Sequence, residues 1–180
     1  MLWRQSDTYV SSMVGADHES ATEIHDKVIR NEGPPWFAVS PLMHAAGGLW
    51  TVFSGALAGL PVVLYDDRAK FDPRSVWQTA EREKVGLMTM VGDAYASPLI
   101  DELNRNNYDL SSIYAIGTGG AATNPKHVSA LLEKLPQLTI IDGYGSSETG
   151  GNMGFGHNQR GSHRETFDLR EGGGPWCPRT

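Results

Sequence analysis

The sequence predicts an α/β fold in which a mostly parallel sheet is built from consecutive βαβ crossovers. Short runs of apolar, β-branched and aromatic residues recur with starts about 25 residues apart, and segments of helical character separate them. A strand that returns at this interval with a helix in between is typical of parallel strands joined by crossover connections. The five runs are residues 36–40, 61–65, 86–91, 113–117 and 138–142.

Two of the intervening helices are marked by their first residues. Asp72-Pro73 and Asn124-Pro125 each place a side-chain capping oxygen before a proline, and proline is well suited to the first helical position. The second helix should pack one face on the sheet, because its apolar residues follow the i, i+3, i+4, i+7 spacing: Val128, Leu131, Leu132 and Leu135. From Gly150 onward the chain is rich in Gly, Asn, His and Arg without periodicity, and we expect a loop there.

Composition excludes several classes of protein. The 180 residues suit one domain or part of a larger one, and a net charge of −6 offers no basic field for nucleic acid. Cys177 is the only cysteine, which predicts no internal disulfide and a cytoplasmic location. The apolar stretch 45–65 is interrupted by Gly59-Leu60-Pro61, so we expect two elements of a soluble protein there and no integral membrane segment.

Three polar or glycine-rich stretches follow predicted strands. They are "PLMHAAGG" (41–48), "TGGAAT" (118–123) and "GYGSSETG" (143–150). In an open parallel sheet, ligands bind beyond the carboxyl ends of the strands. We therefore expect the three stretches to meet at one edge of the sheet.

The last stretch has the groups that a metal–nucleotide requires. Glu148 is an oxygen ligand suited to Mg²⁺, Ser146 and Ser147 can bind phosphate oxygens, and Tyr144, followed by Gly145, can lay its ring on a base. A glycine-rich turn or a serine N-cap would explain the same residues. A nucleophile elbow, G-x-S-x-G, is nearly complete from Gly145, but Thr149 occupies the place of its final glycine.

The other two stretches are less distinctive. Gly119 and Gly120 allow a ligand to approach the backbone, although an ordinary βα turn would have the same residues. His44 begins an apolar helix whose N-terminus favours a neutral imidazole, and a purely structural histidine is the alternative. The small residues Gly47, Gly48, Ala121 and Ala122 suggest room for a bulky group.

With these stretches in this order, the chain resembles the adenylate-forming superfamily of acyl-CoA synthetases, luciferases and peptide-synthetase adenylation domains. It looks most similar to the fatty-acyl and sterol-acid CoA ligases over residues 1–173, and "YGSSETG" is the most specific element. The resemblance implies part of the large N-terminal domain of that fold. It also implies ATP, Mg²⁺ and CoA as cofactor and co-substrates, with a small carboxylic acid as the partner.

The resemblance also assigns roles to individual residues. It implies that Tyr144 stacks on adenine, with Asp142 near the adenine amine, and that Gly119, Gly120 and Ala121 form the opposite wall. Ser147 would contact phosphate, Glu148 would hold Mg²⁺, and His44 would help to close the acyl pocket. Gly145 and Ser146 belong to the same nucleotide-binding stretch.

The family reaction activates an acid as acyl-AMP and then transfers the acyl group to CoA. The chain lacks the family's Ser/Thr/Gly-rich phosphate loop, ribose-binding aspartate, hinge and lysine-bearing C-terminal domain, so we expect an inactive fragment. Residues 174–180 look unrelated to the family and suggest a shifted reading frame or gene-model artefact. The alternatives are a non-catalytic nucleotide-binding remnant and, further away, an α/β-hydrolase-type esterase.

Overall fold

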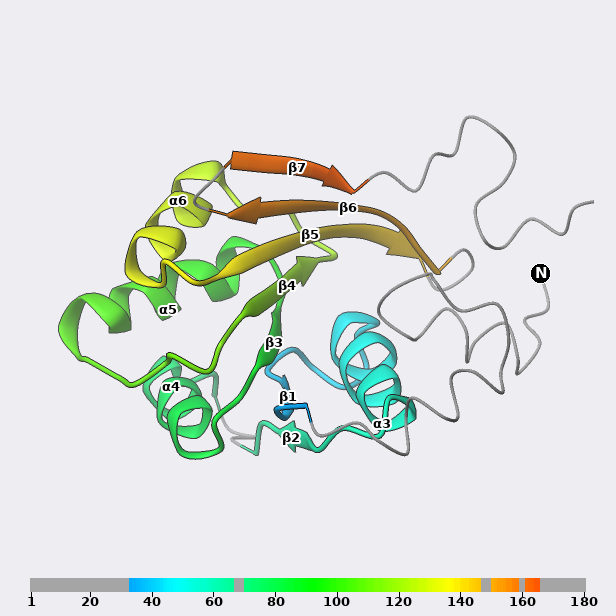
Figure 1. Cartoon of the computed structure of the whole chain (residues 1–180), viewed down its shortest axis with the longest axis horizontal. Coiled ribbons are helices and arrows are strands. Elements are labelled where there is room, and N and C mark those ends of the chain that lie inside the picture. Colours follow the sequence, from blue (N-terminus) through cyan, green and yellow to red (C-terminus); the bar gives the residue numbers. More distant parts are fainter. Residues whose placement is uncertain (1–32, 67–69, 147–149, 159–160, 166–180) are drawn as a thin grey trace, which may run out of the picture.

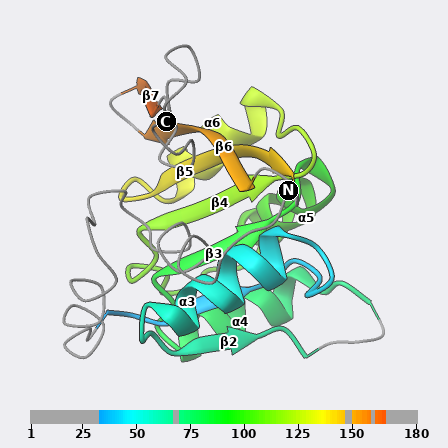
Figure 2. The ribbon, with the colours of Figure 1, turned by 90° about the vertical axis from the view of Figure 1, so that its right-hand side faces the viewer.

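A seven-stranded sheet organises the computed structural model, which describes residues 33–66, 70–146, 150–158 and 161–165. The strand order is β2-β1-β3-β4-β5-β6-β7, and Figure 2 shows the labelled strands from β2 at the bottom to β7 at the top. The strands are β1 (Trp36–Ala38), β2 (Val62–Leu64), β3 (Leu87–Met90), β4 (Ala115–Gly119), β5 (Thr139–Ser146), β6 (Gly150–Asn158) and β7 (Gly161–Glu165).

The first five strands pair in parallel, and a helical connection joins each to the next (Figure 1). A π-helix, η1 (Ala46–Phe53), continues into α3 (Ser54–Leu57) between β1 and β2. The other crossovers contain α4 (Pro73–Arg82), α5 (Asp93–Arg105) and α6 (Pro125–Lys134). The mostly parallel α/β fold predicted from five β-rich runs is therefore confirmed.

The two predicted helix caps are present. The Asp72 side chain accepts a hydrogen bond from the Arg74 amide at 3.0 Å, and Asn124 does the same for Lys126 at 3.0 Å. Each side chain satisfies one of the free N–H groups at a helix start.

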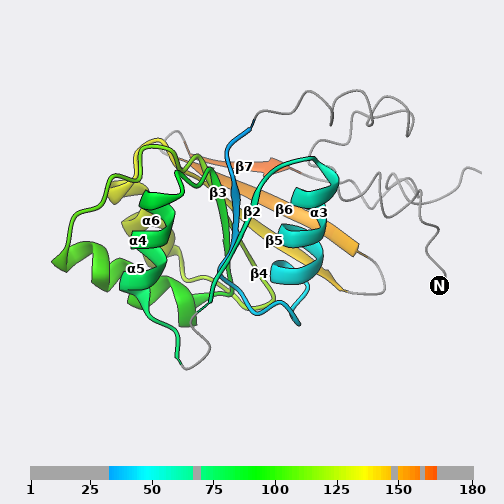
Figure 3. The same ribbon diagram turned by 90° about the horizontal axis from the view of Figure 1, so that it is seen from below.

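Helices cover both faces of the sheet. Figure 3 shows α4, α5 and α6 on one side and the η1–α3 segment on the other. Each face of the sheet has its own apolar core. Because side chains alternate between the faces, Met88 packs under α4–α6, whereas its neighbour Leu87 packs with Trp36 and Trp50 on the other face. The larger core is fully apolar at its centre, where these side chains are completely or almost completely buried: Phe37, Trp77, Met88, Leu99, Ile116, Leu131 and Ile140.

The last two strands correct the predicted loop after Gly150. β6 pairs antiparallel with β5, and β7 pairs antiparallel with β6. Backbone hydrogen bonds at an open sheet edge can form without a periodic side-chain pattern, so a glycine-rich segment gave no strand signal. The fifth predicted strand is also longer than expected, since β5 continues through Ser146.

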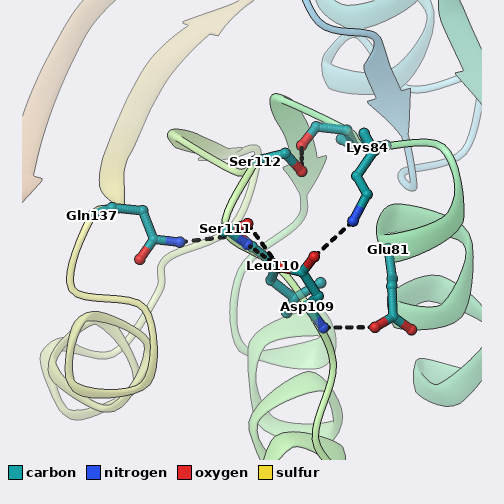
Figure 4. Close-up of polar contacts among 8 residues, drawn as sticks. Glu81, Lys84, Asp109, Leu110, Ser111, Ser112 and Gln137 are labelled. Carbon is teal, nitrogen blue, oxygen red and sulfur yellow. Dashed lines mark hydrogen bonds and ion pairs between the residues drawn. The ribbon is translucent and has the colours of Figure 1, made fainter.

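Polar contacts hold together the segments that precede β3 and β4, at the amino ends of these strands (Figure 4). Lys84 Nζ lies 2.7 Å from Asp109 Oδ2, and the Glu81 carboxylate accepts a hydrogen bond from the Asp109 amide at 2.7 Å. Ser112 Oγ donates to the Val85 carbonyl at 2.9 Å. These contacts join the end of α4 to the loop before β4, at the amino ends of the strands and away from their carboxyl ends.

Candidate functional site

The segments after β1, β3 and β4 meet one another and strand β5 at the carboxyl ends of the parallel strands. The distances from a Cβ added at each glycine show how closely these segments pack. A Cβ added to Gly120 would lie 2.5 Å from the His44 ring. A Cβ on Gly92, in the loop after β3, would lie 2.8 Å from the Ala121 Cβ. A Cβ on Gly119 would lie 2.7 Å from the Gly143 carbonyl oxygen of β5. The predicted convergence of the His44 stretch with Gly119–Ala122 at one edge is therefore found.

His44 is oriented by the backbone of the helix that follows it. Its Nδ1 accepts a hydrogen bond from the Ala46 amide at 3.1 Å, and its carbonyl accepts one from Gly48 at 2.9 Å. A ring that accepts at Nδ1 carries its hydrogen on Nε2. Nε2 is also the ring nitrogen that lies against Gly120.

The loop after β4 presents a surface with very little side chain. Gly120, Ala121 and Ala122 are exposed, and Gly120 has a φ of +80°, a conformation that favours glycine. A planar group could therefore approach this loop closely.

Gly47 and Gly48 have to be small because their α-carbons pack against the turn that precedes η1. A Cβ on Gly47 would lie 2.5 Å from the Ser40 and Pro41 carbonyl oxygens, and one on Gly48 would collide with the Leu42 carbonyl. Both glycines therefore allow η1 to pack against the turn that precedes it. A shallow depression of about 260 Å³ does lie beside this turn, lined by Leu42, Met43, His44, Ala45, Gly48 and Leu49.

The predicted adenine-binding stretch lies in a strand, beside the β4 loop. Asp142 pairs with Thr118 and Gly143 with Gly119, whereas Tyr144 and Gly145 flank a register shift opposite β6. Ser146 pairs with Gly150 at the end of this hairpin. Ser147 and Glu148 lie outside the described residues, as do the side chains of Tyr144 and Ser146.

The same hairpin argues against the hydrolase alternative. A nucleophile elbow places its serine on a turn between a strand and a helix. Here β5 is followed by the antiparallel strand β6, which begins at Gly150.

Buried hydroxyl groups, which the sequence analysis missed, form hydrogen bonds beneath the surface at the carboxyl ends of the strands. Thr51 Oγ1 and Thr89 Oγ1 lie 2.7 Å apart, and Ser40 Oγ donates to Thr89 at 3.1 Å. Thr118 and Thr123 form a second pair at 2.8 Å. All five side chains are at most 8% exposed. They satisfy one another near the carboxyl ends of β1, β3 and β4, and a Ser or Thr within two residues of the end of an apolar strand was the available signal.

Asp93 is a second residue that sequence analysis missed. Its Oδ1 accepts hydrogen bonds from the Asn124 amide at 2.8 Å and from His127 Nδ1 at 2.7 Å. These two hydrogen bonds lower the pKa of Asp93. The signal was Gly92-Asp93 directly after a strand, the same kind of position as the three stretches that were selected.

Within the described residues, no group of three or more His, Cys, Asp or Glu side chains is arranged to hold a metal ion. Among the same residues, none of the helices has the length and apolar character needed to cross a membrane.

Comparison with known proteins places the chain in a family. The model of the AMP-binding enzyme family matches residues 7–171, so the chain belongs to this family. The medium-chain acyl-CoA ligase Mig of Mycobacterium avium is 36% identical over 159 residues, covering 85% of this chain and 29% of the relative. A medium/long-chain-fatty-acid–CoA/3-oxocholest-4-en-26-oate–CoA ligase of Mycobacterium marinum is 34% identical, covering 94% of this chain and 32% of the relative.

Solved structures agree on the fold. O-succinylbenzoate coenzyme A synthetase of Bacillus subtilis, in complex with ATP and magnesium ion, matches with a TM-score of 0.58 and 22% identity. That match covers 75% of this chain and 27% of the synthetase. A luciferase-like enzyme from the mealworm Zophobas morio matches with a TM-score of 0.61 and 19% identity, covering 83% of this chain and 32% of the enzyme. The fold is thus that of part of an adenylate-forming enzyme, and the chain spans less than a third of the length of the two ligases described above.

Proposed function

We propose that this chain is the adenine- and acid-facing part of an ATP-dependent acid–CoA ligase. The observation that carries the proposal is the contact of His44 with Gly120 at the carboxyl edge of a sheet that belongs to the AMP-binding family. Two stretches to which the family resemblance gives roles, and which lie far apart in the sequence, meet at that contact. A cytoplasmic location is part of the proposal and is supported by the single cysteine.

In the proposed reaction, a carboxylate oxygen attacks the α-phosphorus of ATP, and pyrophosphate leaves to give acyl-AMP. The thiol of CoA then attacks the acyl carbon and AMP leaves, so that a thioester replaces the mixed anhydride. Both steps depend on holding charged groups close together and neutralising the charge that develops.

The described residues would contribute shape and positioning. Gly119, Gly120 and Ala121 would form one wall of the adenine site, because they are small and two of them are exposed. Tyr144 would form the other wall from the adjacent strand β5, with Asp142 near the adenine amine and Gly145 and Ser146 continuing that side. His44 would close the acid pocket, with the hydrogen on Nε2 available for donation.

Ser147 and Glu148 would contribute the phosphate and metal ligands. A carboxylate and neighbouring hydroxyls form an oxygen-only donor set, which suits Mg²⁺. The ion, when bound, would supply positive charge beside the phosphates.

The acid is proposed to be a fatty or a sterol acid. The two curated relatives described above are named for medium-chain acyl, medium/long-chain fatty-acid and 3-oxocholest-4-en-26-oate substrates. The apolar depression beside His44 is consistent with such an acid, since its lining includes Leu42, Met43 and Leu49.

Nucleotide titrations of the 180-residue chain test the proposal. We expect ATP and AMP to shift the backbone amide NMR signals of Gly119–Ala121 and Asp142–Gly145, with Mg²⁺ strengthening the binding of ATP but not of AMP. Glu148→Gln should remove the Mg²⁺ effect. The matched control is Glu133→Gln, which changes an exposed glutamate on α6 and should leave it intact. Amide signals unaffected by either nucleotide would contradict the proposed site.

A further inference from the structure

Asp93 joins two loops at the candidate site. Its carboxylate lies at the start of α5, whereas its two hydrogen-bond donors, the Asn124 amide and His127 Nδ1, lie at the start of α6. The segment between β4 and those donors is the Gly120–Thr123 loop. Asp93 therefore fixes the far end of the loop that would form the adenine wall.

The near end of the same loop is also attached to the β3 side. The Gly92 amide donates to Thr118 Oγ1 at 3.3 Å, and Thr118 is hydrogen-bonded to Thr123 at 2.8 Å. The Asp93 amide donates to the Ala122 carbonyl at 3.3 Å. The loop is therefore connected to residues 92–93 at its start, middle and end.

The hydrogen bond to Asn124 is more than helix capping. Asn124 is itself the N-cap of α6, and its own side chain already accepts from the Lys126 amide. Asp93 belongs to a different helix, α5, so its carboxylate connects two elements instead of ending its own. A bond between elements constrains their relative position, which a local cap does not.

Charge supports this connection at neutral pH. The Asn124 and His127 hydrogen bonds keep the pKa of Asp93 below its ordinary value, and the charge of Lys126 acts in the same direction. The His127 side chain is 18% exposed and that of Asp93 is 46% exposed. The carboxylate thus stays ionised and accessible at the edge of the site, while its histidine partner is largely covered.

We propose that Asp93 is a positioning residue that holds the Gly119–Ala122 loop in the conformation that receives the nucleotide. The inference rests on the proposed function, because it assigns Asp93 a role toward the ligand of that site. Asp93 would not contact the nucleotide itself. It would act through the Asn124 and His127 contacts.

The test compares Asp93 with a second ion-paired aspartate at the opposite edge of the sheet. Asp93→Ala, Asp93→Asn and the control Asp109→Asn are made in the 180-residue chain, and each is measured for thermal midpoint and for AMP affinity. Asp109 pairs with Lys84 far from the Gly120–Thr123 loop that follows β4. The loss of this pair should therefore lower the thermal midpoint without changing the affinity for AMP. Asp93→Ala should weaken AMP binding at least about tenfold, since two charge-assisted hydrogen bonds are lost. Asp93→Asn should restore part of the affinity, because its amide oxygen can still accept from Asn124.

Backbone amide shifts separate this inference from the proposed function. If Asp93→Ala moves the signals of residues 119–124 and weakens AMP binding, both stand. If AMP binds the variant as tightly as the unmodified chain, or if affinity falls in proportion to stability in all three variants, the positioning role is overturned. If the unmodified chain binds no AMP, the proposed function fails, and so does the role of Asp93 toward the nucleotide. In that case, amide shifts caused by Asp93→Ala and confined to residues 119–124 would still show that Asp93 holds the loop.

Discussion

The imidazole of His44 lies so close to Gly120 that a methyl group at position 120 would come within 2.5 Å of both Cε1 and Nε2. Gly120 also has a φ of +80°. The residue is therefore restricted to glycine for two independent reasons, one steric and one conformational.

These two reasons can be separated by mutation. Gly120→Ala should lower the free energy of unfolding by about 2 kcal/mol or more, from the left-handed backbone and the overlap with His44 together. In a His44→Ala background only the backbone cost should remain, about 1 kcal/mol. Urea unfolding of the four proteins in this cycle measures the difference. Equal costs in both backgrounds would show that His44 does not press on position 120.

Gly117 and Trp50 form a second close pair, where a Cβ on Gly117 would overlap the Trp50 ring. The Trp50 ring also lies 6.2 Å from the ring of Trp36. Gly117→Ala should therefore destabilise the chain by about 1–3 kcal/mol through overpacking. A Trp50→Leu background should be less sensitive to the alanine, because the smaller side chain leaves space above β4. Thermal unfolding followed by circular dichroism tests this, and an alanine that costs as much in the Trp50→Leu background as in the unmodified chain would contradict it.

Lys84 has a φ of +51°, unusual for a residue with a side chain. Lys84→Gly and Lys84→Ala both lose the ion pair with Asp109. The side chains of Lys84 and Asp109 are each more than half exposed. The loss of this exposed pair is common to both variants and cancels when they are compared. The glycine variant should be more stable than the alanine variant by about 1 kcal/mol, because only glycine adopts this backbone without strain.

The control for Lys84 is Lys126, which lies in the first turn of α6 with its amide hydrogen-bonded to the cap. There the order should reverse, since glycine weakens a helix by about 0.5–1 kcal/mol relative to alanine. The urea midpoints of Lys84→Gly, Lys84→Ala, Lys126→Gly and Lys126→Ala measure the order of stability at each position. The same order at both positions would mean that the left-handed backbone at Lys84 carries no cost.

Asp109 should make stability depend on pH in acid. Hydrogen bonds from Lys84 and Ser111 lower the pKa of its carboxyl from 3.8 to about 2. A carboxyl with a lower pKa in the folded state contributes stability that is complete above the ordinary value and is lost as pH falls toward the folded value. The urea midpoint should therefore fall between about pH 4 and pH 2, and less steeply in Asp109→Asn. Lys84→Ala should also reduce the slope, and a slope unchanged in both variants would exclude this pair as its source.

The 180-residue polypeptide by itself should release no measurable pyrophosphate from ATP with Mg²⁺ and fatty or sterol acids. Its sequence contains no Ser/Thr/Gly-rich phosphate loop, and one missing electrostatic donor at such a site typically costs about 10²–10³ in rate. A longer protein that contains this segment together with such a loop and a lysine-bearing C-terminal domain should turn over the same acids, and Glu148→Gln in that protein should remove most of the activity. Thioester formation by the 180 residues alone would contradict this expectation.

Local sequence determined the elements that have a clear apolar pattern or a capping residue at the start of a helix. Asp72 and Asn124 marked helix starts correctly because a cap acts within two residues of itself. β1, β3 and β4 were found because they are almost entirely buried and mostly apolar, whereas β2 and β5, which are less buried, were found from their β-branched residues. The expected edge of the site followed from the parallel topology, since the carboxyl ends of parallel strands lie together.

The tertiary structure decided what depends on contacts between distant residues. β6 became a strand because β5 offered it an unpaired edge, which its own glycine-rich sequence does not reveal. Gly47 and Gly48 proved to be packing residues, because only the fold brings the Ser40–Leu42 turn against them. Asp93 acquired its role from Asn124 and His127, which lie on another helix, and no local pattern encodes a hydrogen bond across two loops.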